Sequence, residues 1–256
     1  MIQIQYIKSF YPLKEQIFEQ AILKEYLQYQ ILNIVFSSKY AKDLSFLGGT
    51  AIRLIHNSNR FSEDLDFDNF GLNENDFDEL SKIIKFEMEK LGFEVEIKNI
   101  YKGAFRCYIK LPKLLKDLGL SIYDDEKILV QLDTVKQDYL YDSDKKILDK
   151  FDVYKLINVC PIDIILSKKI HALIDRKRIK GRDFFDIVYL YKLTNPNFPY
   201  LKAKKGIDNE IKLKEKLLEF IEQLNLSEYA EDVKPFLINP DEINRVTTFK
   251  EFINSL

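Results

Sequence analysis

The chain has 256 residues, 46% of them apolar, and its 39 basic and 41 acidic residues nearly cancel to a net charge of −2. This composition excludes a disordered or low-complexity chain. No apolar run approaches the ~18 residues of a membrane span, and the first residues lack the pattern of a signal peptide, so we expect a cytoplasmic protein without a membrane anchor. Cys107 and Cys160 are too few for a disulfide framework and are expected to be buried thiols.

Hydrophobic periodicity predicts a mixed α and β region followed by a helical one. We expect helices over 13–40, 50–55 and 76–91, strands at 44–47, 63–68 and 127–135, and a hairpin over 93–111, with helices from Pro161, near Phe184, at 211–224 and at 227–236. The predicted fold class is therefore α+β, a mixed sheet with flanking helices. We divide it into an α/β domain, 1–145, and a mainly helical domain, 146–256, that contributes to the active site.

Charge is concentrated in two segments. Ser62 to Glu79 holds eight acidic and no basic residues, whereas Lys168 to Arg182 holds seven basic residues and one acidic residue. A solvated surface usually mixes the two signs, so separated blocks indicate fields directed at ligands, cations for the first and phosphates for the second. The alternative is that each block is a solvated face.

The acidic segment follows a glycine turn. Gly48, Gly49 and Thr50 lead into an expected helix, where free backbone N–H groups and a hydroxyl suit a phosphate, although such turns are also common without a ligand. On the next expected strand, alternation projects Asp64 and Asp66 from one face about 6.5–7 Å apart, which suits a shared Mg²⁺ or a solvated face.

A further acid, Asp133, lies in the apolar run 127–135. Burying an unpaired carboxylate is costly, so a neighbouring cation is one explanation and a cap on a nearby loop is the other. His56 and His171 are isolated in the sequence, and we expect them to be polar helix side chains rather than catalytic bases.

These motifs resemble a known family. Gly48-Gly49-Thr50-Ala51, followed by Arg60, Ser62, Asp64 and Asp66, is similar to the first motif of the AbiEii/AbiGii toxin family of nucleotidyltransferases, in the DNA polymerase β-like superfamily. The similarity continues through 130–133, 167–173 and 180–187. It implies the polymerase β-like fold, an NTP substrate and two Mg²⁺ ions held by Asp64, Asp66 and Asp133.

The resemblance also implies roles in the helical region. Lys168 would contact a nucleotide phosphate, and Asp183 would orient the nucleotide or a partner such as Arg182 or Lys168. Lys169 faces about 100° away from Lys168 on a helix, so only one of the two is expected to be functional, and we choose Lys168. The expected catalytic set is Asp64, Asp66, Asp133, Lys168 and Asp183, and the expected nucleotide contacts are Gly48, Gly49, Thr50, Arg60, Ser62 and Lys168.

A basic run lies between the two expected helices. It comprises Arg176, Lys177, Arg178, Lys180 and Arg182, and we expect it to bind RNA as a polyanion. Aromatic residues suited to base stacking are missing inside the run, so direct reading of an RNA sequence is not indicated.

The resemblance implies transfer of an NMP from an NTP to an acceptor, with the tRNA 3′ end as the acceptor it most suggests. The protein would be the toxin of a type IV toxin–antitoxin or abortive-infection system, with a possible cognate antitoxin. One alternative is a non-catalytic module that binds RNA or protein, which has no need for the acids and Lys168. Others are a metal-dependent hydrolase or a small-molecule nucleotidyltransferase, which would need a closed pocket rather than a basic groove.

Overall fold

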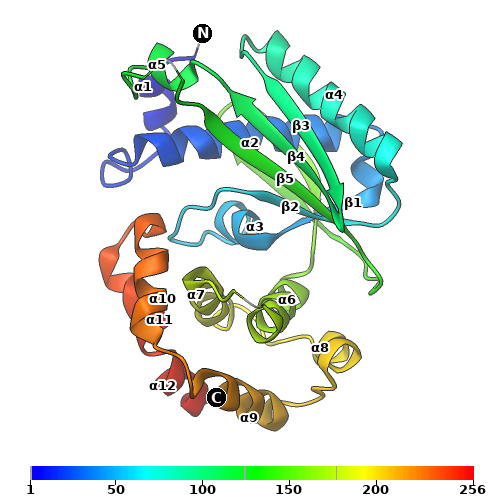
Figure 1. Cartoon of the computed structure of the whole chain (residues 1–256), viewed down its shortest axis with the longest axis vertical. Coiled ribbons are helices and arrows are strands. Elements are labelled where there is room, and N and C mark those ends of the chain that lie inside the picture. Colours follow the sequence, from blue (N-terminus) through cyan, green and yellow to red (C-terminus); the bar gives the residue numbers. More distant parts are fainter. Residues whose placement is uncertain (1, 124, 177) are drawn as a thin grey trace. The chain divides into compact units, whose positions relative to one another are not determined.

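The computed structural model describes residues 2–123, 125–176 and 178–256. The chain divides into two compact units. The sheet unit comprises the chain up to Asn57 and Phe61–Cys160, and the helical unit comprises Ser58–Arg60 and Pro161–Leu256. Figure 1 labels the α-helices of both units and the strands β1 to β5.

The described elements of the sheet unit are α1 (Ile4–Lys8), α2 (Glu19–Ser37), η1 (Ala41–Asp43), β1 (Leu44–Leu47), α3 (Gly48–Leu54), β2 (Leu65–Asn69), α4 (Glu74–Lys90), β3 (Glu96–Lys102), β4 (Ala104–Leu111), α5 (Leu114–Asp117), β5 (Ile128–Lys136), β6 (Asp144–Lys150) and β7 (Val153–Val159). Those of the helical unit are α6 (Ile162–Asp175), α7 (Gly181–Leu190), α8 (Phe198–Lys205), α9 (Glu210–Ile221), α10 (Leu226–Val233), η2 (Lys234–Phe236), η3 (Pro240–Ile243), α11 (Asn244–Thr247) and α12 (Phe249–Ser255).

The strands of the sheet unit form one mixed sheet. Within the described residues it has seven strands in the order β3-β4-β5-β2-β1-β7-β6. The pairs β2/β5 and β1/β7 are parallel, and the remaining neighbours are antiparallel. The predicted mixed sheet with flanking helices is therefore confirmed.

One face of this sheet carries the core. Helices α2 and α4 cover that face, and α2 is buried along its length because it also contacts α1 and α4 (Figure 1). On β5 the alternation of the strand buries Val130 and Leu132 and leaves Gln131 and Asp133 partly exposed, so Asp133 lies on the opposite face. Cys107 and Cys160 are buried thiols, as predicted.

The structure differs from the expected domain boundary. The predicted boundary at residue 145 falls inside β6, the first strand of a β6–β7 hairpin that extends the sheet at its edge, and the two units divide after Cys160 instead. The charged residues of β6 hid this strand in the sequence. Lysine-rich edge strands are common because charge protects an exposed edge from further pairing.

Helix α7 is the centre of the helical unit. It contacts α6, α10, α11 and α12 (Figure 1). Phe184 packs against the rings of Tyr229 and Phe249, and Gly181 lets α7 approach the backbone of α10, since a Cβ at Gly181 would lie 1.8 Å from the Tyr229 carbonyl oxygen. None of the helices in the described ranges is both long and apolar enough to cross a membrane.

Candidate active site

The sheet brings two of the predicted carboxylates together. In the parallel pair β2/β5, Asp66 is the register partner of Asp133, so their side chains project at the same level from the same face. Neighbouring strands lie about 4.8 Å apart. Residues 67 positions apart in sequence therefore form one pair of acids.

The negative charge of Asp133 is only partly balanced by its neighbours. Gln131 donates a hydrogen bond to Asp133 Oδ2 at 2.8 Å, and the Nε of Arg106 lies 3.6 Å from the same oxygen. The other oxygen, Oδ1, is buried without a hydrogen-bond partner. Burial raises the pKa of Asp133, against the hydrogen bond from Gln131 and the charge of Arg106. This carboxylate is suited to a cation.

The glycine turn supports Asp66. Gly48 has a φ of 79°, and a Cβ at this position would lie 2.1 Å from Asp66 Oδ2. Any other residue would be strained in this conformation and would displace the carboxylate. Gly48 is therefore required by the close approach between the β1–α3 turn and Asp66. Gly49 is buried in the first turn of α3.

The loop that precedes β2 is held by side chains from two helices. Gln28 of α2 donates to the backbone carbonyls of Ser62 and Glu63 at 3.0 and 2.9 Å. Thr50 of α3 is fully buried, and its hydroxyl donates to the carbonyl of Asp64 at 2.5 Å. The Thr50 hydroxyl, which the sequence assigned to a phosphate, thus anchors the loop, because its single proton is already donated to Asp64.

The three acids predicted as metal ligands do not form one preformed group. Among the residues that the structure describes, no three His, Cys, Asp or Glu side chains are grouped so as to hold a metal ion. Asp64 precedes β2, whereas Asp66 and Asp133 are in register. The pair still fits Mg²⁺, which typically takes one or two carboxylates and completes its shell with water and substrate phosphates. The unpartnered Oδ1 of Asp133 supports this fit.

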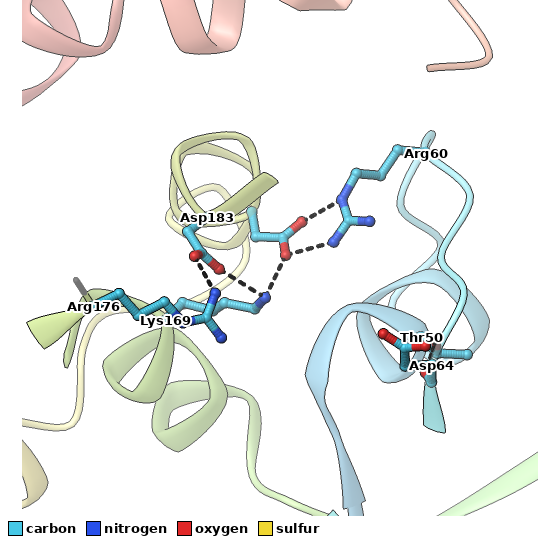
Figure 2. A network of polar contacts seen from close by, with 7 residues as sticks. Thr50, Arg60, Asp64, Lys169, Arg176 and Asp183 are labelled. Atoms are coloured by element: carbon cyan, nitrogen blue, oxygen red, sulfur yellow. Dashed lines mark hydrogen bonds and ion pairs between the residues drawn. The ribbon is translucent and has the colours of Figure 1, made fainter. Parts of the chain in front are cut away.

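The helical unit contains a chain of alternating charges (Figure 2). Lys169 of α6 binds Asp186 at 2.8 Å and Asp183 at 3.3 Å, both on α7. Asp183 also binds the Nη1 of Arg176 at 2.5 Å. Asp186 accepts two parallel hydrogen bonds from Arg60, from Nε at 2.7 Å and from Nη2 at 2.6 Å. The bidentate pair holds both planar groups in a fixed orientation.

Arg60 enters the helical unit with its flanking segment. Its side chain is almost fully buried, its backbone pairs with Leu237 as an isolated β-bridge, and the N–H of Ile238 donates to the carbonyl of Asn59. The structure therefore engages Arg60 with Asp186, a partner that the sequence analysis did not name, since it assigned Arg60 to the nucleotide.

The network fixes the ionisation of its buried members. Burial opposes charge on Asp186, but Arg60 and Lys169 outweigh it and lower the pKa of this carboxyl. Burial likewise opposes charge on Lys169, but Asp186 and Asp183 outweigh it and raise the pKa of the ammonium. Both groups are held in their charged forms, which leaves a preorganised ammonium on α6.

The structure distinguishes the two adjacent lysines. Lys169 joins the network, whereas the ammonium of Lys168 lies 5.9 Å from the ring centre of Tyr200. A signal for Lys169 was present in the sequence: it follows the buried Ile165 by four residues and precedes the buried Leu173 by four, so helical periodicity places it on the packed face. Asp186 was also left out of the predicted set and is central to the network.

The predicted RNA-binding run is divided among different environments. Arg176 pairs with Asp183. Arg178, Lys180 and Arg182 line a pocket, and the Arg182 guanidinium lies 4.8 Å from the ring centre of Phe236. Lys177 lies outside the described residues. The run is therefore not one uniform basic face.

Comparison with solved structures supports the fold. The chain is similar to JHP933 from Helicobacter pylori, with 19% identity over 93% of both chains and a TM-score of 0.54. It is also similar to a putative nucleotidyltransferase from H. pylori, with 18% identity over 93% of this chain and 96% of that one and a TM-score of 0.56. A third similar structure is the nucleotidyltransferase toxin MenT4 from Mycobacterium tuberculosis, with 14% identity over 100% and 91% of the two chains and a TM-score of 0.58.

The family comparison covers most of the chain. No curated protein matches it. Residues 30–251 match the family described as "Nucleotidyl transferase AbiEii toxin, Type IV TA system", which includes most of the C-terminal helices that showed only generic patterns in the sequence. Membership implies an NTP substrate and an antitoxin partner. The chain is therefore a nucleotidyltransferase that belongs to the AbiEii toxin family of type IV toxin–antitoxin systems.

Proposed function

We propose that the protein transfers an NMP from an NTP to RNA, with the 3′ end of tRNA as the acceptor and Mg²⁺ as the required cation. The observation that carries this proposal is the in-register pair Asp66 and Asp133, with one carboxylate oxygen buried and unpartnered. Removing a carboxylate from water without a partner is costly, so a cation beside this pair stabilises it.

In this reaction the 3′-hydroxyl oxygen of the acceptor forms a bond to the α-phosphorus, and the bond from that phosphorus to the oxygen bridging to the β-phosphate breaks. Pyrophosphate leaves, and the hydroxyl proton passes to water. Asp66 and Asp133 would hold the cation, and Asp64 would serve as a further ligand for a second ion when substrate is bound. When bound, Mg²⁺ stabilises the charge that develops on the attacking and leaving oxygens.

We assign the phosphate contact in the helical unit to Lys169 rather than Lys168. Two carboxylates hold the Lys169 ammonium, so little side-chain freedom is lost when it binds a phosphate. Asp183 and Asp186 act as positioning residues, and Arg60 orients Asp186. The Lys168 alternative predicts the opposite mutational result, given in the Discussion.

The RNA acceptor is supported by the exposed cations before α7, Arg178 and Lys180. Transfer to the 3′ end of tRNA would block aminoacylation and thus translation, which accords with a toxin. We expect the reaction in the cytoplasm, where NTPs and tRNA are available.

The test is incubation of the purified protein with each α-³²P-labelled NTP, total tRNA and Mg²⁺, followed by a denaturing gel. Parallel reactions contain EDTA, periodate-oxidised tRNA, and the Asp66→Asn variant. Asp142→Asn, which changes an exposed acid in the loop before β6, is the matched control.

We expect label in tRNA with at least one NTP, and its loss with EDTA, oxidised tRNA or Asp66→Asn but not with Asp142→Asn. If a protein or a small molecule carries the label and the RNA does not, the acceptor is that protein or small molecule and not RNA. Full activity of Asp66→Asn would refute the carboxylate assignment.

A further inference from the structure

A pocket of about 390 Å³ lies in the helical unit, lined by the segment that leads into α7, by α10 and by η2. Its size falls in the range of ordinary small-ligand sites. One side is fixed, because the N–H of Gly181 donates to the carboxylate of Asp232 at 2.9 Å and Gly181 closely approaches Tyr229. The pocket is thus built where α7 and α10 are joined directly.

The pocket combines cations with aromatic rings. Arg178, Lys180 and Arg182 line it together with Tyr229 and Phe236. Arg182 lies over the Phe236 ring, which orients its planar guanidinium. Unpaired RNA bases stack on aromatic rings and on guanidinium planes, while their phosphates pair with lysine and arginine.

Two carboxylates narrow the choice of ligand. Glu228 and Asp232 also line the pocket, so a free inorganic anion would face repulsion there. A nucleobase instead presents exocyclic amino groups, which donate hydrogen bonds to carboxylates. A base with its phosphate satisfies the acids, the cations and the rings at once.

We propose that this pocket binds one unstacked nucleotide of the RNA acceptor. The inference rests on the RNA acceptor of the proposed function and adds where one of its nucleotides is held. The pocket is linked to the candidate site through α7, because Arg182 lines the pocket and the next residue, Asp183, binds Lys169. A nucleotide held at Arg182 therefore sets the position of RNA relative to the Lys169 network.

The test measures binding directly, by fluorescence anisotropy of a 5′-fluorescein-labelled single-stranded hexa-adenylate, with unlabelled AMP as competitor. The variants are Arg178→Ala, Tyr229→Leu and Tyr229→Phe, and the matched control is Lys216→Ala on α9, whose side chain pairs with Glu219. Thermal melting checks each fold, since Tyr229 also packs on Phe184.

We expect Tyr229→Leu to weaken hexa-adenylate binding about tenfold, through loss of one stacked base. Arg178→Ala should weaken it several-fold and reduce its salt dependence. Tyr229→Phe keeps the ring and should bind normally, as should Lys216→Ala. AMP should compete only at far higher concentration than the hexanucleotide, because it lacks the additional backbone contacts.

The proposal is overturned if the wild-type protein does not bind hexa-adenylate, if Tyr229→Leu and Arg178→Ala both bind within twofold of wild type, or if AMP binds as tightly as the hexanucleotide. The label-transfer assay judges the proposed function separately. If tRNA is labelled but the pocket variants bind RNA normally, only the pocket proposal is refuted. If RNA binding depends on the pocket but no label is transferred, only the proposed transfer reaction is refuted.

Discussion

The carboxylate pair of the sheet unit and the ion-pair network of the helical unit differ in how well neighbouring groups balance their buried charges. In the sheet, burial raises the pKa of Asp133, and one of its oxygens lacks a hydrogen-bond partner. In the helical unit, opposite charges alternate from Arg60 through Asp186 and Lys169 to Asp183, and the pKa values of Asp186 and Lys169 shift toward the charged forms. One carboxylate oxygen of the pair has no hydrogen-bond partner within the described residues, whereas Arg60, Asp186, Lys169 and Asp183 each contact a group of opposite charge.

The contrast is local and not a property of the sheet unit as a whole. Glu25 is buried in that unit too, but Arg53 and Lys150 each bind it at 2.8 Å. Burial opposes its charge, yet the two cations lower the pKa of Glu25 below its ordinary value. Buried Glu25 therefore has two closely bound cationic side chains, whereas Asp133 has, among the side chains that the structure describes, only the more distant Arg106. That difference supports the proposed role of Asp133 as a ligand of the cation.

The largest expected effect is a loss of NMP transfer when the carboxylate pair of the sheet unit is changed. Asp66→Asn and Asp133→Asn should each reduce NMP transfer on the order of 10³-fold, about 4 kcal/mol, because each removes a charge that holds the cation. Asp133→Asn should lower the free energy of unfolding by no more than about 1 kcal/mol, since Arg106 lies 3.6 Å from this carboxylate, farther than the ion-pair partners of Asp186. Initial-rate assays and urea denaturation measure the two quantities. A stable variant with near-normal rates would contradict the assignment.

In the ion-pair network of the helical unit, a substitution is expected to reduce stability. Arg60→Met leaves Asp186 without its bidentate partner, and breaking a buried pair from one side costs roughly 3–5 kcal/mol of unfolding free energy. Lys234→Met, which removes an exposed partner of Glu231, is the control and should cost under about 1 kcal/mol. The double variant Arg60→Met/Asp186→Leu should recover much of the loss. If Arg60→Met unfolds like wild type in urea, the network is not a stabilising element.

The two adjacent lysines of α6, Lys168 and Lys169, are expected to differ in their effect on activity. Lys169→Met should weaken NTP binding or turnover about 10²-fold, near 2.7 kcal/mol, through loss of a preorganised charge contact. Lys168→Met should stay within about threefold of wild type. Binding of a non-hydrolysable NTP analogue, measured by calorimetry beside steady-state kinetics, separates affinity from rate. The opposite ranking would restore Lys168, the choice made from the sequence.

The smallest expected effect concerns pH. Burial, with a further contribution from Lys146, lowers the pKa of His56 to about 4 from an ordinary value of 6.5. Between pH 6.5 and 4 the unfolded chain binds a proton that the folded chain does not, so stability falls as pH falls, by roughly 2–3 kcal/mol across the window. Asp186 has a lowered pKa, so its contribution is present above about pH 4 and is lost only at lower pH.

Unfolding measured from pH 7 to 4 should therefore show a decline that His56→Gln removes, with hydrogen exchange locating the early loss in the sheet unit. An unchanged slope in His56→Gln would show that another group is responsible. His171→Gln is the control, since His171 lies partly exposed beside Asp175 in the helical unit.

Several elements could be predicted because their signals are local. The turn at Gly48, the alternation around Asp66 and the helix from Pro161 follow from patterns within a few residues, and the structure has them in β1–α3, β2 and α6. The β6–β7 hairpin could not be recognised by the same rule, since its edge strand is mostly polar outside the buried Leu148. Its identity as a strand depends on pairing with β7 rather than on its own composition.

The sequence by itself determined the chemistry available to this protein: the glycine turn, the acids Asp64 and Asp66, an isolated acid at Asp133, and adjacent lysines. Tertiary structure alone decided which of these groups act together. Register across β2 and β5 pairs Asp66 with Asp133, and packing of α6 on α7 places Lys169 in the ion-pair network. Arg60 joins this network through Asp186, which is 126 residues away in the sequence. Such contacts join residues distant in the chain, so their partners follow from topology and packing rather than from local pattern.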